Sequence, residues 1–263
     1  MNATLQNSTP LRIVQPRLHL PAMRGVIERR MLVNFRCDPA TVAQLLPGPF
    51  RPKLVRGYAM AGICLIRLGD VRPGFMPAAV GLTSENAAHR IAVEWDEAGA
   101  TREGVFIPRR DTSSWLNRLA GGRLFPGEHR AATFTVWETP ERLKLEMRAA
   151  DDGAFVRVAA RVTDALPEGS VFRDMEEASR FFLGGALGWS ARTGAGEFDG
   201  LELCCDLWRM EPLVVEHVES SFFGDSSLFP PGTATFDSAF LMRDIAHEWR
   251  ARGRMLCNGG EQP

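Results

Sequence analysis

The feature that most constrains the fold of this chain is a succession of short runs in which apolar and polar residues alternate. A period of two places successive side chains on opposite faces of a β-strand. In residues 142–148, RLKLEMR, every second residue is charged, which predicts a strand with one wet face and one buried face. The predicted strands occupy residues 26–36, 58–68, 89–97, 103–109, 131–137, 142–148, 154–162, 201–208 and 213–222.

Two short helices are predicted by their starting signals. Asp38 supplies a cap and Pro39 a favourable first-turn residue for the first helix. Asp174 with Glu177 forms a capping-box pattern at the start of the second. These helices are predicted at residues 40–46 and 178–183.

Two further helices are expected. One should begin near Ser113 or Ser114 and end at the Gly121-Gly122 pair. The other is expected at residues 237–250, with its large apolar residues on one side packed against the sheet or a partner subunit. Those residues are Phe240, Leu241, Ile245 and Trp249.

Strands outnumber helices and often follow one another without a crossover helix, which disfavours a doubly wound parallel sheet. We expect a mainly β, α+β fold in which a curved antiparallel sheet closes into a β-barrel with short helices at its rim. A length of 263 residues suits one such domain, over residues 21–258, preceded by a loose tail at residues 1–20.

Composition argues against several partners. The net charge is −1, and no basic cluster is interleaved with aromatic residues, so nucleic acid is not an expected partner. No apolar run reaches the roughly 20 residues of a membrane span, and the N-terminal stretch lacks a signal-peptide core, so we expect no membrane partner and a cytoplasmic protein. The five cysteines lack paired zinc-site spacings and are expected to be reduced.

Lysine is scarce among the basic residues. Of 31 lysines and arginines, only Lys53 and Lys144 are lysines. Arginine is effectively never deprotonated and forms no imine. Lys144 lies on the charged face of its strand, and Lys53 follows a proline in an expected loop, so we predict no Schiff-base chemistry.

Familiar catalytic and metal motifs are incomplete. His247-Glu248 begins like a zincin motif, but Ala251 stands where the second histidine would be. Residues 188–192 lack the second glycine of a nucleophile elbow, and residues 194–200 miss the dinucleotide-binding spacing, so both are interpreted as turns. We expect no metal and no cofactor.

Polar residues concentrate between positions 85 and 130, where predicted strands end and loops begin. Binding sites often form at such strand ends. Alternation places His89 and Arg90 on opposite faces of their strand, and it likewise separates Arg109 from Arg110, so only one of that second pair should reach a shared site. The alternative interpretation is that these charges form ordinary surface ion pairs, each worth about 0 to 1 kcal/mol.

The sequence also resembles a known superfamily. The resemblance rests on Asp38-Pro39, Leu46-Pro47, Glu85-Asn86, Arg90, the run from Arg109 to Ser114 and the run from Gly122 to Gly127, with 217–221 and 237–243 as its C-terminal part. On these motifs the chain resembles an uncharacterised branch of the acetoacetate decarboxylase-like superfamily. The resemblance implies that superfamily's β-barrel.

In the characterised decarboxylases of that superfamily, a lysine pair follows a Gly-Phe-Pro-like turn and one lysine forms an imine with the substrate. Here Glu128, His129 and Arg130 follow the corresponding turn, and no lysine is present. Glu85 resembles the family's buried catalytic glutamate in placement. The resemblance therefore implies the fold but not the imine mechanism.

We expect a central pocket for a small anionic organic acid that carries a carbonyl group. Candidate substrate-binding residues are Arg90, Arg109, Arg110 and Arg130, and candidate catalytic acid/base residues are Glu85, Glu128 and His129. A buried arginine among them should pair with Glu85, Glu128 or a ligand carboxylate.

Two functions remain open at this point. The first is a small-molecule-binding protein without Schiff-base chemistry. The second is a lyase or isomerase that acts on a small keto acid by non-covalent acid/base catalysis. Fold similarity alone does not choose between these two functions. A homo-oligomer is a separate open alternative, which concerns assembly and not activity.

Overall fold

The computed structural model describes residues 11–14, 22–119, 127–192 and 196–257. Within these ranges most residues lie in β-strands. The strands are β1 (Arg12–Val14), β2 (Met23–Cys37), β3 (Arg51–Pro52), β4 (Leu54–Val55), β5 (Tyr58–Pro73), β6 (Leu82–Glu97), β7 (Ala100–Thr112), β8 (His129–Glu138), β9 (Arg142–Ala149), β10 (Phe155–Val162), β11 (Leu187–Ala191), β12 (Glu197–Cys204), β13 (Glu211–Ser220) and β14 (Ala234–Leu256). The helices are α1 (Pro39–Leu45), α2 (Trp115–Leu119) and α3 (Met175–Gly184), with a 3-10 turn, η1, at Ala78–Val80.

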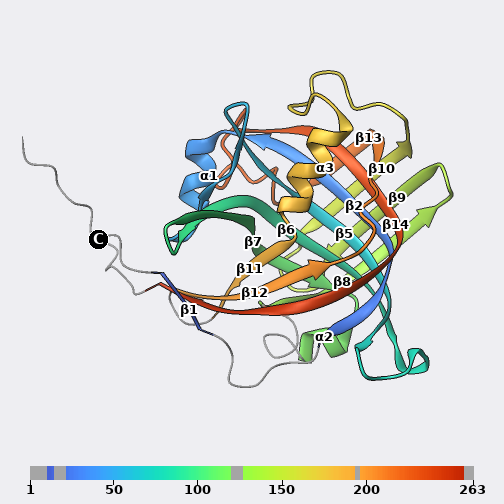
Figure 1. Cartoon of the computed structure of the whole chain (residues 1–263). Helices are drawn as coiled ribbons and strands as arrows, with labels where there is room; N and C mark the ends of the chain where they lie inside the picture. The colour runs from blue at the N-terminus through green and yellow to red at the C-terminus, as the bar shows by residue number, and fades with distance from the viewer. Residues whose placement is uncertain (1–10, 15–21, 120–126, 193–195, 258–263) are drawn as a thin grey trace, which may run out of the picture.

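The strands form one sheet that closes on itself (Figure 1). A larger ring runs through β7, β8, β9, β10, β13, β14, β2, β5 and β6, because β6 pairs with β7. A smaller ring runs through β14, β2, β5, β6, β7, β11 and β12, because β12 pairs with β14. The two rings share β14, β2, β5, β6 and β7. The predicted mainly β fold with a closing sheet is therefore confirmed.

The sheet is mixed rather than purely antiparallel, which corrects one detail of the prediction. Strand β7 pairs with β6 in antiparallel fashion, but its other edge pairs in parallel first with β11 and then with β8. The first contact joins Val105 to Gly188, and the second joins Arg110 to His129. Strand β7 thus forks at the point where the two rings separate.

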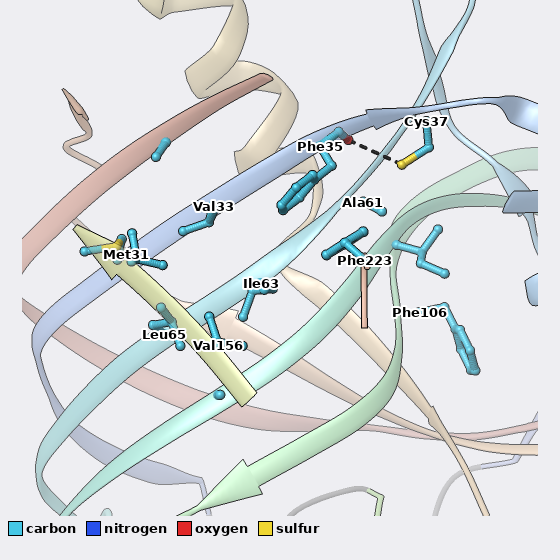
Figure 2. Close-up of a cluster of buried hydrophobic side chains, with 14 of the residues drawn as sticks. Met31, Val33, Phe35, Cys37, Ala61, Ile63, Leu65, Phe106, Val156 and Phe223 are labelled. Carbon is cyan, nitrogen blue, oxygen red and sulfur yellow. Dashed lines mark hydrogen bonds between the residues drawn. The ribbon is translucent and has the colours of Figure 1, made fainter. Parts of the chain in front are cut away.

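One hydrophobic core lies on the face of the shared strands that looks into the larger ring. Figure 2 shows part of this cluster, with side chains from β2, β5, β7 and β10 directed toward one another. Phe35 of β2 stacks on Phe223, with ring centroids 4.0 Å apart. Burial of each large apolar side chain contributes about 1.5 to 3 kcal/mol. Because β9 and β10 face water on their other side, their sequences alternate as predicted.

A second core covers the opposite face of the shared strands. It contains Leu32 of β2, Ile66 of β5 and Phe240 of β14, and α3 packs on it through Ala178 and Phe182. Strands of the shared set therefore bury both faces. Strands buried in this way have near-continuous apolar sequences instead of alternating ones.

The capped helices form as predicted. The Asp38 carboxylate accepts a hydrogen bond from the Thr41 amide at 2.8 Å at the start of α1. The Asp174 carboxylate accepts from the Glu177 amide at 2.7 Å at the start of α3. Helix α2 begins directly after Ser114, also as predicted, and its expected end at Gly121-Gly122 lies outside the described residues.

The predicted helix at residues 237–250 is wrong: this stretch belongs to the long strand β14, drawn in red in Figure 1. Phe240 and Leu241 are both fully buried, but in different cores on opposite faces of the strand. A strand with two buried faces lacks the alternation that identifies strands, and its apolar residues mimic a helical stripe. Asp237, the first residue of the predicted helix, accepts hydrogen bonds from the Val171 amide and the Ser170 hydroxyl.

Two smaller expectations also change. Residues 188–191, interpreted as a turn, form most of β11. Arg12–Val14, placed in the predicted loose tail, pairs with the end of β14, while residues 1–10 and 15–20 of that tail lie outside the described residues.

No helix within the described ranges is both long and apolar enough to cross a membrane.

Candidate functional site

A cavity of about 100 Å³ lies within the smaller ring, and every strand of that ring contributes to its wall. We call it the arginine cavity. Its polar lining consists of Arg30, Cys64, Asn86, Arg90, Arg110, Asp111 and His129. Its apolar lining includes Ile66, Leu68, Val105, Ile107, Leu201, Leu203 and Trp249.

Arg30 of β2 reaches the cavity from the face opposite Arg29. Its Nε donates to the Cys64 sulfur at 3.4 Å, and its Nη1 lies 3.9 Å from the Met242 sulfur. The guanidinium also lies over the Trp208 ring, 5.5 Å from the centroid. These are weak or soft partners for a cation that is only 7% exposed.

Arg90 lies where the pairing between β6 and β7 is interrupted by a bulge, a feature that re-aims side chains. Its Nη2 donates to Asn34 Oδ1 at 2.8 Å, and its guanidinium lies 5.1 Å from the centre of the Phe182 ring. Its Nε has no acceptor among the described residues. Burial lowers the pKa of Arg90 to about 10, an effect that Cys64 opposes and Arg30 reinforces.

Arg110 and His129 are neighbours across the parallel pairing of β7 and β8. The Arg110 Nε donates to the Ser190 hydroxyl at 3.3 Å, and burial lowers the arginine's pKa to about 10. Burial also lowers the pKa of His129 to about 4, with Arg110 adding to the effect and a backbone contact at Gly127 opposing it. His129 is therefore neutral at pH 7.

Positive charge dominates the arginine cavity. Among the described residues, neither Arg30 nor Arg90 nor Arg110 forms an ion pair with a carboxylate. Asp111 borders the same cavity, but its two oxygens accept hydrogen bonds from Arg109 at 2.7 and 2.8 Å. A buried guanidinium without a counter-charge is costly, so these three arginines favour an anion in the space between them.

The remaining candidate residues at the strand ends lie outside this cavity. Arg109 pairs with Asp111 and Asp152, and Arg130 pairs with Asp152. Arg109, Arg130 and the exposed Glu128 line an outer groove of about 840 Å³. Of the two consecutive arginines of β7, only Arg110 lines the arginine cavity, as the alternation of faces predicts.

Arg110 and His129 border the outer groove as well as the arginine cavity. They stand between the inner space and the wider opening. A small molecule that enters from the groove would meet these two side chains first.

Glu85 lies on neither surface. Its carboxylate accepts from Arg29 Nη2 at 2.5 Å and from Arg67 Nη1 at 3.3 Å. The contact with Arg67 joins β6 to its neighbour β5, where Arg67 is the cross-strand partner of Glu85, and the contact with Arg29 reaches across β5 to β2. In this arrangement Glu85 serves as a structural counter-ion, and its expected catalytic role gains no support from its position.

Lys53 is less exposed than its sequence context suggests. Its side chain is 16% exposed, and its ammonium lies 2.5 Å from Glu103 and 4.6 Å from the centre of the Phe181 ring. It borders a small space of about 20 Å³ that shares Arg90 with the arginine cavity. The expectation of a solvated lysine holds for Lys144, on the exposed face of β9, but not for Lys53.

No group of three or more histidine, cysteine or acidic side chains suited to a metal ion occurs among the residues that the structure describes.

Sequence reasoning missed Arg30, Cys64 and Asn86. Arg30 follows Arg29 inside a strand that is otherwise buried on both faces. Two adjacent charged side chains are costly to bury in such a strand unless each has a partner. The Arg29-Arg30 pair was therefore a sequence signal that could have identified Arg30. Cys64 carries no comparable signal, because cysteine is an ordinary buried residue.

Comparison with solved structures identifies the fold. The chain is similar to an acetoacetate decarboxylase-like enzyme from Sphingomonas wittichii RW1, with a TM-score of 0.56 and 16% identity over 95% of this chain and 100% of that one. It is also similar to acetoacetate decarboxylase from Legionella pneumophila, with a TM-score of 0.57 and 12% identity over 97% and 96% of the two chains.

A further similar structure is the enduracididine biosynthesis enzyme MppR complexed with pyruvate. Its TM-score is 0.59, and it is 10% identical over 92% of this chain and 91% of that chain. At these identities the likeness concerns the fold. No curated protein sequence matches the chain.

A family model completes the comparison. Residues 26–184 match DUF2071, a family described as an uncharacterized conserved protein. The match covers more than half of the chain, from within β2 through β10 to the end of helix α3. The chain thus belongs to the DUF2071 family and has an acetoacetate decarboxylase-like fold.

Proposed function

We propose that this chain binds a small anionic organic acid with a carbonyl group in the arginine cavity, without Schiff-base chemistry. Arg30, Arg90 and Arg110 hold the carboxylate and polarise the carbonyl oxygen. The single observation that carries the proposal is the presence of these three arginines, none paired with a carboxylate among the described residues, around one cavity.

The charge balance supports an anionic ligand. Arg90 is 7% exposed and still has an unused N–H on its Nε. Planar guanidinium groups recognise carboxylates through paired, charge-assisted hydrogen bonds. A bound carboxylate would supply the counter-charge that protein side chains supply to Arg29 and Arg109.

The size of the cavity supports a very small ligand. Its volume of about 100 Å³ is below the roughly 150 Å³ of an engineered protein cavity that accommodates benzene. An acid of about six non-hydrogen atoms is therefore the appropriate class. The mostly apolar wall suits a short carbon chain beyond the carboxylate.

The similar structures support the same class. MppR, which shares the fold, was solved with pyruvate bound. Pyruvate has the carboxylate, the adjacent carbonyl and the short carbon chain that the arginine cavity would accept. It is accordingly the first ligand to test.

Calorimetric titration with pyruvate tests the proposal. We expect wild-type protein to bind pyruvate, and Arg110→Met to bind it about 10- to 100-fold more weakly, because hydrogen bonds to charged groups contribute about 1.5 to 3 kcal/mol. Acetone, which lacks the carboxylate, should not bind measurably.

The matched control is Arg161→Met, which removes an exposed arginine from β10. It should leave pyruvate affinity unchanged. If Arg110→Met bound pyruvate as tightly as wild type, the arginine cavity would not be the binding site. If acetone bound as well as pyruvate, the carboxylate would not be the recognised group.

The second candidate function is a lyase or isomerase reaction on a small keto acid. The observation that favours it is the position of His129, which borders the arginine cavity next to Arg110 and is neutral at pH 7. A neutral imidazole can accept a proton from the carbon beside a carbonyl, while the arginines stabilise the resulting enolate.

Proton NMR in deuterated water tests this second function. Catalysed exchange of the methyl hydrogens of pyruvate would support the enzyme, and His129→Gln should then abolish the exchange while leaving pyruvate affinity within about threefold. Binding without exchange would leave the first function standing and remove the second.

A further inference from the structure

Cys64 is the cysteine that lines the arginine cavity. It lies on β5, with its side chain on the same face as Ile66, and is 8% exposed. The sulfur accepts the hydrogen bond of Arg30 Nε at 3.4 Å. Arg90 and Arg110 line the same cavity as Cys64.

The cavity provides an independent sign of a ligand beside this sulfur. The Arg90 guanidinium is more than nine-tenths buried, lines the same cavity and has an unpartnered Nε. A carboxylate that satisfies this group would lie within the same small space as Cys64. In a cavity of about 100 Å³, the carbonyl carbon of such an acid has few positions that are far from the sulfur.

We propose that the Cys64 sulfur adds reversibly to the carbonyl carbon of the acid bound in the arginine cavity. This inference rests on the binding function proposed above. A carbon–sulfur bond forms, the π bond of the carbonyl breaks, and its electron pair moves to the oxygen. The thiol proton ends on that oxygen, so the product is a hemithioketal and no oxidant or reductant is needed.

The surroundings of Cys64 suit this addition. Cysteine acts as a nucleophile as its thiolate, and reactive cysteines occur beside cationic groups. Negative charge that develops on the carbonyl oxygen would be met by guanidinium N–H groups in a cavity whose wall is mostly apolar.

The other cysteines serve as internal controls. None of them lines the arginine cavity. Burial raises the pKa of the Cys37 thiol to about 12, and burial likewise raises the pKa of Cys204, Cys205 and Cys257. These shifts make them poor nucleophiles near neutral pH.

The first experiment follows pyruvate labelled with carbon-13 at the carbonyl carbon by NMR, using the full chain in stoichiometric excess. We expect the carbonyl resonance of bound pyruvate to move to the region of tetrahedral carbon with wild type and with Cys205→Ser. With Cys64→Ser it should stay in the ketone region, while calorimetry still detects pyruvate binding.

The second experiment uses bromopyruvate, which alkylates a nucleophilic thiol in the cavity with loss of bromide. Peptide mapping should find Cys64 modified about tenfold faster than Cys205 or Cys257, because it combines an anion site with neighbouring cations. Excess pyruvate should slow this modification. Iodoacetamide, which is neutral, should not show the same preference for Cys64.

The outcomes separate the two proposals. If wild type binds pyruvate by calorimetry but the bound carbonyl stays a ketone, the addition is overturned and the binding function stands. If pyruvate does not bind, the binding function fails for this ligand, and the alkylation experiment decides the role of Cys64. Modification of Cys64 no faster than of Cys205 and Cys257 would overturn that role.

Discussion

Arg29 and Arg30 are consecutive residues of β2, and both are buried, but the groups around them differ. Arg29 meets the carboxylates of Glu85 at 2.5 Å and Glu138 at 3.3 Å. Arg30 meets two sulfur atoms and an indole ring. Arg29 is neutralised by two carboxylates of the protein and helps to hold strands together, whereas no carboxylate among the described residues pairs with Arg30.

The same division recurs on β7. Arg109 is paired with two aspartates, while its neighbour Arg110 donates to a serine hydroxyl and borders the arginine cavity. Alternation along a strand makes this division possible, because adjacent side chains point to opposite faces. Pairing with carboxylates, more than burial, therefore separates Arg29 and Arg109 from the arginines that line the cavity in this chain.

The largest expected effect is on stability without ligand. Arg29→Met leaves the Glu85 carboxylate without its closest partner and should cost about 3 to 5 kcal/mol of unfolding free energy. Arg30→Met removes a charge that has no carboxylate partner. It should either lower the unfolding free energy by less than about 1 kcal/mol or increase it. Urea unfolding of both variants measures these changes. Equal losses of unfolding free energy would contradict the distinction between Arg29 and Arg30.

The next effect concerns the wall of the arginine cavity. Trp249 of β14 lines the cavity and packs against the second core. Trp249→Ala should lower the unfolding free energy by about 1.5 to 3 kcal/mol, as expected for loss of a large apolar side chain. Trp115→Ala is the control, because Trp115 is 63% exposed. The melting temperature of this variant should hardly differ from that of wild type. Similar melting curves for both variants would contradict this account of the wall.

A smaller effect is expected from pH. Burial lowers the pKa of His129 to about 4 in the folded protein, while the unfolded value is near 6.5. The unfolded state therefore binds the proton more readily, so the stability contributed by neutral His129 is complete above pH 6.5 and declines toward pH 4.

At pH 5.5, His129→Gln should show about 1 kcal/mol less acid destabilisation than wild type, each measured relative to its own value at pH 7. His217→Gln, at a site that is 59% exposed, should follow the wild-type curve. Stability should be compared by urea unfolding at both pH values. An unchanged acid response in His129→Gln would show that this histidine is not buried beside Arg110.

The last prediction is that borohydride has no effect on the two lysines. Borohydride treatment in the presence of pyruvate or acetoacetate should leave both lysines unmodified. Lys144 is exposed on β9, and the Lys53 ammonium is paired with Glu103 at 2.5 Å. Mass spectrometry of the peptides makes the measurement. A reduced adduct on Lys53, which borders the same small space as Arg90, would overturn the prediction that the chain does no Schiff-base chemistry.

How well the fold could be predicted from the sequence depends on how each strand is buried. Strand β9 has one wet face, and its alternation identified it correctly. Strand β14 has two buried faces along much of its length, and its sequence imitated a helix. The pattern reports contact with water, so it loses information where both faces are dry.

The candidate site was predicted in part for a related reason. Strand ends and alternation pointed to Arg90, Arg110 and His129, which the fold brings around one cavity. Glu85 was expected to be catalytic because its placement resembles that of the family's catalytic glutamate, whereas in the structure its carboxylate pairs with Arg29 of β2 and Arg67 of β5. Which cation a carboxylate neutralises is decided by tertiary pairing, and this cannot be read from local pattern.

The fork in β7 has a consequence for how such a protein can change over evolutionary time. One edge of this strand must match β6, while the other matches β11 near Val105 and β8 near Arg110. A single inserted or deleted residue between these points would exchange the surroundings of Arg109 and Arg110 and shift three pairings at once. New ligand preferences in this fold should therefore arise by replacing side chains on a fixed strand length, with length changes confined to the loops beyond it.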